Sequence, residues 1–130
     1  MSNDIKQQHA SSVVKICNAL STNWSGETSY CDDWSSSNPS SGQCAVSALV
    51  LQDYCGGEIR RCVVAGTPHY FGQVVDSTAA QFGTVAINYD TSTARSRQRI
   101  LRHADTRQRY ELLKGRVKET MWVRNRKEIR

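Results

Sequence analysis

The stretch that decides the fold is residues 38–58, NPSSGQCAVSALVLQDYCGGE. Its middle, CAVSALVL, is apolar nearly all round, and a helix of that composition lies inside a fold rather than on its surface. Pro39 and the two serines after it are typical of a helix start, since a serine side chain can accept the first free N–H groups. The paired glycines favour a helix end. The stretch therefore predicts a buried central helix from Gly42 to about Tyr54.

Upstream of this helix, the sequence predicts two segments, a helix followed by a long loop. Residues 4–20 have apolar side chains at three- and four-residue spacing, which predicts an amphipathic helix. In residues 21–42, eight of the 22 side chains are serine, which predicts a long loop. Loops of this length in a small domain are usually functional or disordered, and the aromatic residues here favour partial order. We expect Trp24 and Trp34 to form part of a cleft wall.

Downstream, the pattern changes from strands to helices. Residues 58–65 and 69–75 are rich in β-branched and aromatic side chains and are separated by Gly-Thr-Pro, which predicts a hairpin. A third strand is predicted at 84–89. Two helices are then predicted, one from residues 92 or 93 to about 103 and one from Asp105 onward. The sequence therefore predicts an α+β fold, in which the central helix packs on a small antiparallel sheet between flanking helices.

Length and composition limit the class of protein. The chain has 130 residues, of which 38% are hydrophobic, so we expect a single domain over 1–130. No run approaches 18 apolar residues, and a membrane span is not expected. The first residues, MSNDIKQQHASS, lack the apolar centre of a secretory signal. We therefore expect a cytoplasmic protein.

The charge is concentrated at one end of the chain. Residues 1–94 carry a net −4 and residues 95–130 a net +9. A basic segment can meet nucleic acid, an acidic protein or water. Its arginines at 95, 97, 99 and 102 would spread around a helix rather than line one face, which favours solvation. We therefore expect a protein or peptide as substrate or partner, and not nucleic acid. The sequence does not predict an oligomeric state.

The five cysteines form neither a disulfide framework nor a zinc pattern. Their number is odd, no C-x-x-C pair occurs, and the spacing of Cys55, Cys62 and His69 by seven residues matches no common zinc site. We expect reduced thiols, no metal and no cofactor. Cys17, Cys55 and Cys62 are best read as small buried hydrophobic side chains.

One order of residues could carry chemistry: Cys44, then His69, then Asp76. A thiol at a helix start lies beside free N–H groups and the positive helix end, which favour the nucleophilic thiolate and can hold an oxyanion. A hairpin can bring His69 against that start, and Asp76 can orient the ring from behind. Each residue could also have a purely structural role. Cys44 could pack in the core, His69 could be a buried histidine whose nitrogens are hydrogen-bonded, and Asp76 could cap a helix.

Residues 38–58 resemble the signature of the YunG-like family of small, poorly characterised bacterial proteins. The similarity extends upstream to Trp24-Ser25 and resumes at His69-Tyr70-Phe71, at Val75-Asp76-Ser77-Thr78 and at Arg109-Tyr110-Glu111. The resemblance implies a minimal version of the papain-like or transglutaminase-like fold.

That resemblance also implies site roles. Cys44 would be the nucleophile of a hydrolase acting on amide or thioester bonds (a peptidase, isopeptidase, amidase or deamidase), with His69 and Asp76 as its partners. Gln43 and Ser41 beside the cysteine are candidate oxyanion or supporting residues. Only six residues separate His69 from Asp76, fewer than in typical members. The alternative is therefore a non-catalytic interaction or inhibitor protein on the same fold, derived from a phage or mobile element.

Overall fold

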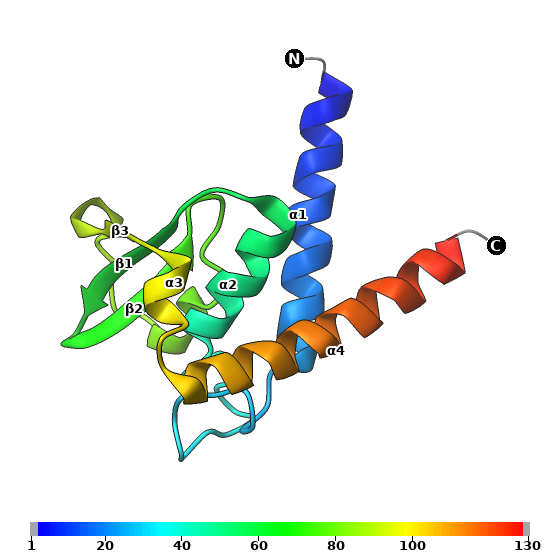
Figure 1. Ribbon diagram of the computed structural model, residues 1–130. Helices are drawn as coiled ribbons and strands as arrows, with labels where there is room; N and C mark the ends of the chain where they lie inside the picture. Colours follow the sequence, from blue (N-terminus) through cyan, green and yellow to red (C-terminus); the bar gives the residue numbers. More distant parts are fainter. Residues whose placement is uncertain (1–2, 129–130) are drawn as a thin grey trace.

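The computed structural model describes residues 3–128, and side chains from residue 12 to residue 124. In this part of the chain, four α-helices and a three-stranded antiparallel sheet form a small α+β fold (Figure 1). In chain order the elements are α1 (Asn3–Asn23), α2 (Cys44–Cys55), β1 (Ile59–Val64), β2 (Thr67–Gly72), the short 3-10 helices η1 (Ala79–Phe82) and η2 (Tyr89–Thr91), β3 (Thr93–Arg95), α3 (Arg97–Ile100) and α4 (Ala104–Glu128).

The sheet has the strand order β2-β1-β3. Ala65 and Gly66 both have positive φ (49° and 81°), which closes a tight hairpin between β1 and β2. In this register Cys62 lies opposite His69. Directly opposed residues of an antiparallel pair point to the same face, so the hairpin fixes the face on which His69 lies.

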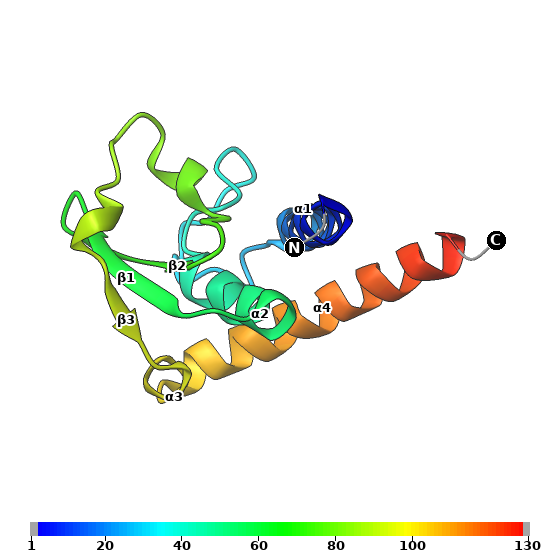
Figure 2. The ribbon, with the colours of Figure 1, turned by 90° about the horizontal axis from the view of Figure 1, so that it is seen from above.

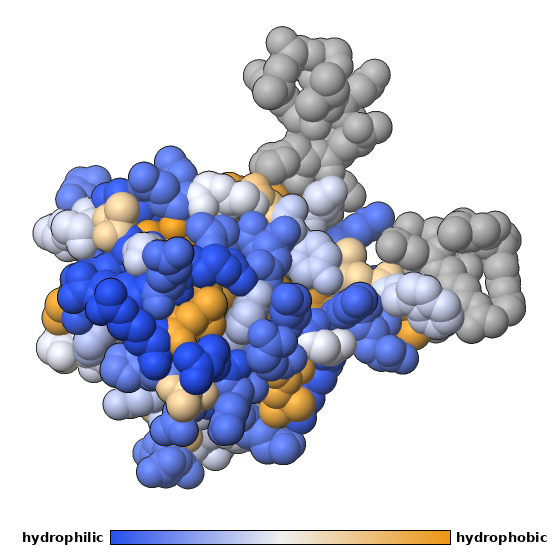
Figure 3. Space-filling view, viewed as in Figure 1, coloured by the Kyte–Doolittle hydropathy of each residue, from blue (hydrophilic) through white to orange (hydrophobic). Residues whose placement is uncertain are grey.

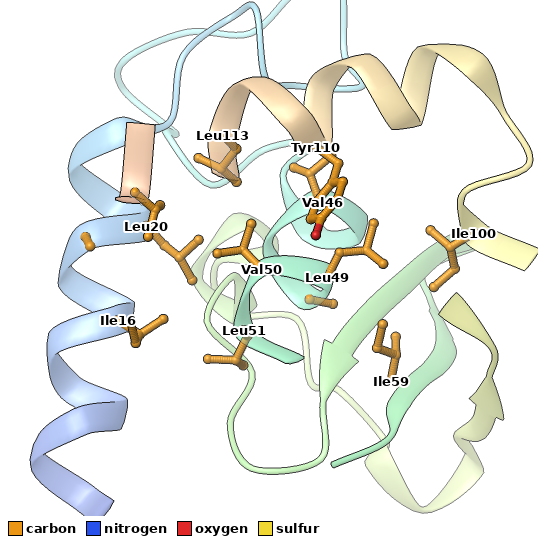
Figure 4. Close-up of a cluster of buried hydrophobic side chains, with 13 residues drawn as sticks. Ile16, Leu20, Val46, Leu49, Val50, Leu51, Ile59, Ile100, Tyr110 and Leu113 are labelled. Atoms are coloured by element: carbon orange, nitrogen blue, oxygen red, sulfur yellow. The ribbon is translucent and has the colours of Figure 1, made fainter. Parts of the chain in front are cut away.

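Helix α2 is the centre of the molecule. It lies between the sheet and the long helices α1 and α4 (Figure 2). Six of its residues are buried, and Leu49 and Val50 are completely inaccessible to solvent. Figure 4 shows these side chains among those of α1, β1, α3 and α4. The prediction of a buried central helix is confirmed.

The two long helices close this core with the expected stripes. On α1, Ile16 and Leu20 are buried. On α4, Tyr110, Leu113 and Val117 are buried at three- and four-residue spacing, as an amphipathic helix requires. Both helices extend well beyond the sheet and α2 (Figure 1).

Two predictions of local structure were wrong. Residues 84–88 form no strand, because Ile87 packs instead against a small cluster of Cys62, Val64 and Phe71. The third strand is β3, which pairs with β1. Since β3 occupies part of the segment predicted as a helix from 92 or 93 to 103, only the short α3 forms there, and the Ser96 side chain accepts from the Arg99 N–H at its start.

The start of α2 also differs from the prediction. The residue preceding the first turn is Gln43, and no side chain caps it. The hydroxyl of Ser40 is buried and makes no hydrogen bond within the described residues. The Ser41 hydroxyl faces the sulfur of Cys31 at 3.8 Å. The expected serine cap is therefore absent, and the first N–H groups of α2 are left without a side-chain acceptor.

Among the described residues, no helix is long and apolar enough to cross a membrane. The face drawn in Figure 3 is mostly hydrophilic, and its hydrophobic residues form small separate patches.

Candidate active site

A histidine–carboxylate pair lies where β2 ends. Nε2 of His69 is 2.6 Å from Oδ2 of Asp76. The strand ends at Gly72, and the chain then turns back, with the N–H of Gln73 donating to the carbonyl of Glu58. This turn brings Asp76 next to the side chain of His69. Oδ1 of the same carboxylate accepts from the N–H of Thr78 at 3.3 Å.

Aromatic rings hold the imidazole in one orientation. His69 is completely buried. The ring of Phe71 stacks on it with centroids 5.7 Å apart, and the ring of Phe82 meets it edge-on at 4.9 Å. The second ring nitrogen, Nδ1, is buried and makes no hydrogen bond within the described residues. Because Asp76 occupies Nε2, Nδ1 is the nitrogen left to exchange a proton with another group.

The surroundings of His69 favour its protonated form. Burial alone lowers its pKa, but the hydrogen bond and the negative charge of Asp76, together with the nearby Cys44 side chain, outweigh burial and raise the pKa to about 9. The thiol of Cys44 thus interacts with the ring that Asp76 holds. The structure brings together the three residues Cys44, His69 and Asp76.

Cys44 is the first residue of α2, and the residue as a whole is only partly buried. It lies at the positive end of a helix whose first turn no side chain caps. Burial raises the pKa of Cys17, Cys55 and Cys62. No disulfide forms among the five.

The four supporting candidates lie around the serine-rich loop. Gln43 is completely buried, and its side-chain amide donates to the carbonyl of Ser25 at 2.9 Å. The carbonyl of Ser41 accepts from the hydroxyl of Ser29. Trp24 donates to the hydroxyl of Ser47 at 2.9 Å, and Trp34 donates to the carbonyl of Pro39 at 2.9 Å. Gln43 and Trp24 therefore join the loop to the start of α2, while Ser41 and Trp34 make hydrogen bonds within the loop.

Two residues near the site were missed by the sequence analysis. The hydroxyl of Tyr89 donates to Oδ2 of Asp76 at 2.8 Å, and nothing in the sequence signals this contact. Arg109 of α4 is partly buried near the site, and burial lowers its pKa. It was visible only as part of the segment Arg109-Tyr110-Glu111 that resembles the family pattern.

The described residues include no group of three or more His, Cys, Asp or Glu side chains arranged to hold a metal ion. What the arrangement provides is a thiol on a partly buried residue, a ring able to take or give a proton, and a carboxylate that orients the ring. These are the parts of nucleophilic acyl transfer.

Comparison with known proteins gives a family but no activity. Residues 12–122 match the family model described as YunG protein. The uncharacterized protein YunG of Bacillus subtilis (strain 168) is 40% identical over 67 residues, which cover 48% of this chain and 56% of that protein. The chain thus spans little more than half the length of this relative. No solved structure matches the chain.

Proposed function

Because this chain belongs to the YunG family, whose matched region contains the Cys44, His69 and Asp76 positions, we propose that it is a cysteine-dependent hydrolase of amide or thioester bonds. The observation that carries the proposal is the 2.6 Å contact between His69 Nε2 and Asp76, on a ring that also interacts with the Cys44 thiol. Asp76 fixes the tautomer, so that Nδ1 is the nitrogen that exchanges a proton with the sulfur.

The first half-reaction makes an acyl-enzyme. The neutral form of the His69 ring takes the thiol proton at Nδ1, and the sulfur of Cys44 attacks the substrate carbonyl. The electron pair of the C=O bond moves to the oxygen, where the uncapped N–H groups at the start of α2 can stabilise it. When the carbonyl reforms, the amine or thiol of the substrate leaves with the proton from His69.

The second half-reaction releases the acid. His69 takes a proton from a water molecule, and the resulting hydroxide attacks the thioester. The bond between Cys44 and the acyl carbon breaks, and the sulfur recovers its proton from the ring. Asp76 orients the ring and stabilises the imidazolium each time it forms.

We extend the proposal to the fold and to the substrate class. A cysteine at the start of a central helix, with a histidine on an adjacent antiparallel sheet and an acid just after its strand, is the arrangement of a minimal papain-like or transglutaminase-like enzyme. The partly buried position of Cys44, beside the serine-rich loop, favours a protein or peptide substrate.

The test is acyl transfer from p-nitrophenyl acetate, followed by mass spectrometry of the Cys44 peptide. We expect an acetyl group to appear on Cys44 and then to disappear by hydrolysis, with p-nitrophenol released in a burst and then steadily. Cys44→Ser should lose the burst, and His69→Asn should slow both steps.

A Cys31→Ser variant is the matched control, since Cys31 is also half-buried and lies close to the same helix start. It should keep the burst. If wild-type Cys44 is never acetylated, the hydrolase proposal is wrong. If it is acetylated but the thioester persists, the chain carries a reactive cysteine without turnover, as the interaction-protein alternative requires.

A further inference from the structure

A groove of about 830 Å³ lies between the serine-rich loop and the first turns of α4. Its lining comes from residues 29–33 on one side and from residues between 103 and 109 on the other. We call it the loop–helix groove. It is lined by the half-buried Arg109 and by the exposed Tyr30, whose ring lies under the guanidinium at 5.5 Å.

The groove is joined directly to the start of α2. The N–H of Tyr30 donates to the carbonyl of Gly42 at 2.9 Å, and the Ser41 hydroxyl faces the sulfur of Cys31. Gly42 precedes Cys44 by two residues. The wall that carries Tyr30 and Cys31 is therefore bound to the backbone that presents the thiol.

Arg109 is held in this groove with part of its guanidinium unused. Nη2 donates to the hydroxyl of Thr106 at 3.1 Å, which fixes the plane of the group. Nη1 is buried and makes no hydrogen bond within the described residues. A buried guanidinium N–H without an acceptor costs free energy, which a ligand oxygen placed there would recover.

The charges around Arg109 indicate that its role is not to neutralise a neighbouring carboxylate. No aspartate or glutamate of the described part of the chain forms an ion pair with it, and Asp105 acts only at longer range. Asp32, Asp33 and Asp105 line the same groove and repel anions in general. An anion would therefore be held at Arg109 by direct contact rather than by the overall field of the groove.

We propose that Arg109 binds a carboxylate of the substrate, so that the enzyme prefers acyl groups that carry a carboxylate close to the attacked carbon. Arginine suits this role because its planar fork matches carboxylate geometry and its charge persists when it is partly buried. The inference rests on the proposed function, since it assigns Cys44 as the atom that attacks.

The test uses two alkylating probes of nearly equal size, iodoacetate and iodoacetamide. In both reactions the Cys44 sulfur attacks the CH₂ carbon and iodide leaves, and only iodoacetate carries a carboxylate. The rates at Cys44 are measured separately by mass spectrometry, and their ratio is divided by the ratio for free cysteine. We expect this corrected ratio to favour iodoacetate by about tenfold, the usual gain from a charge-assisted pair.

Three variants show which residue causes the preference for iodoacetate. Arg109→Gln should remove it, and Arg109→Lys should retain part of it, which also answers the objection that loss of Arg109 unfolds the groove. Arg107→Gln is the matched control, because Arg107 is exposed, is two residues away on the same helix and does not line the groove. It should keep the full preference.

The results separate the two claims. If Cys44 reacts with iodoacetamide no faster than an ordinary thiol, the proposed function fails. If Cys44 is reactive but shows no preference for iodoacetate, or keeps its preference in Arg109→Gln, the inference about Arg109 is wrong and the nucleophile stands. A preference that Asp76→Asn removes and Arg109→Gln leaves unchanged would assign anion binding to protonated His69, and would also overturn the inference.

Discussion

Nε2 of His69 lies 2.6 Å from Oδ2 of Asp76, although only six residues separate the two in the sequence. The contact closes because β2 ends at Gly72, where a Cβ would clash with the Leu51 side chain and approach the carbonyl of Val75 at 3.2 Å. Glycine thus allows the chain to turn tightly against α2. The short connection, which could have separated the pair, instead holds it together.

The first prediction concerns the charge on His69. Asp76→Asn removes the negative partner, so the pKa of His69 should fall from about 9 toward its ordinary value of 6.5. NMR titration of the ring Cε1–H signal of His69 measures this directly. A pKa that stays near 9 in the variant would show that Asp76 is not the group that holds the proton on the ring.

The same raised pKa makes stability depend on pH. The folded ring keeps its proton between pH 6.5 and about 9, where the unfolded ring has lost it. This contribution is complete below pH 6.5 and is lost as pH rises through about 9, and it amounts to on the order of 2–3 kcal/mol. The free energy of unfolding should therefore fall more steeply over this interval in the wild type than in Asp76→Asn. Equal slopes in urea titrations would contradict this.

The second prediction concerns Tyr89, whose hydroxyl donates to the same carboxylate oxygen. Burial and the bond to Asp76 raise the pKa of Tyr89 to about 12, so the hydroxyl remains a donor over the whole working range. Tyr89→Phe should reduce stability by about 1 kcal/mol and lower the acylation rate of Cys44, because Asp76 becomes less firmly held.

Tyr54→Phe is the control for that variant. Tyr54 is exposed to nearly the same extent, 44% against 42% for Tyr89, and lies in the last turn of α2, at the opposite end from Cys44. It should leave the acylation rate unchanged. If both variants behave alike, Tyr89 has no specific role at the site.

The third prediction concerns Gly42, which supports the start of α2. Its φ is +72°, and a Cβ there would overlap the hydroxyl of Ser29 and the backbone N–H groups of Tyr30 and Cys31. Gly42→Ala should therefore displace the loop, lower the free energy of unfolding by several kcal/mol and reduce the reactivity of Cys44. Gly66→Ala is the control, because it adds backbone strain without steric overlap. The φ of Gly66 is +81°, but nothing lies near the added Cβ, so this variant should lose only about 1 kcal/mol of stability. Thermal unfolding of both variants makes the comparison, and equal losses would contradict it.

The features that could be predicted from the sequence are those that depend on residues close together in the chain. The apolar run through Leu49 and Val50 predicted the buried helix because periodicity and composition are local properties. The three-residue strand β3 could not be predicted, since Thr-Ala-Arg has little strand pattern of its own and forms only because the edge of β1 is free to pair.

The candidate site divides in the same way. Cys44, His69 and Asp76 were proposed from their positions at a helix start and at the two ends of a strand, and the structure brings them together. Tyr89 contributes through a hydrogen bond to a residue 13 positions away, and Arg109 lies over the ring of Tyr30, 79 positions away, and no local pattern encodes either contact. Their roles follow only from the fold.

The central claim is that His69, held by Asp76, activates Cys44. The most direct measurement is the rate of alkylation of each cysteine by iodoacetamide at pH 7, resolved by mass spectrometry, in the wild type and in His69→Asn. We predict that Cys44 reacts at least about tenfold faster than Cys31, and that the His69→Asn variant loses this advantage while Cys31 is unaffected. Equal rates at Cys44 and Cys31, or a fast Cys44 that does not respond to His69→Asn, would contradict it.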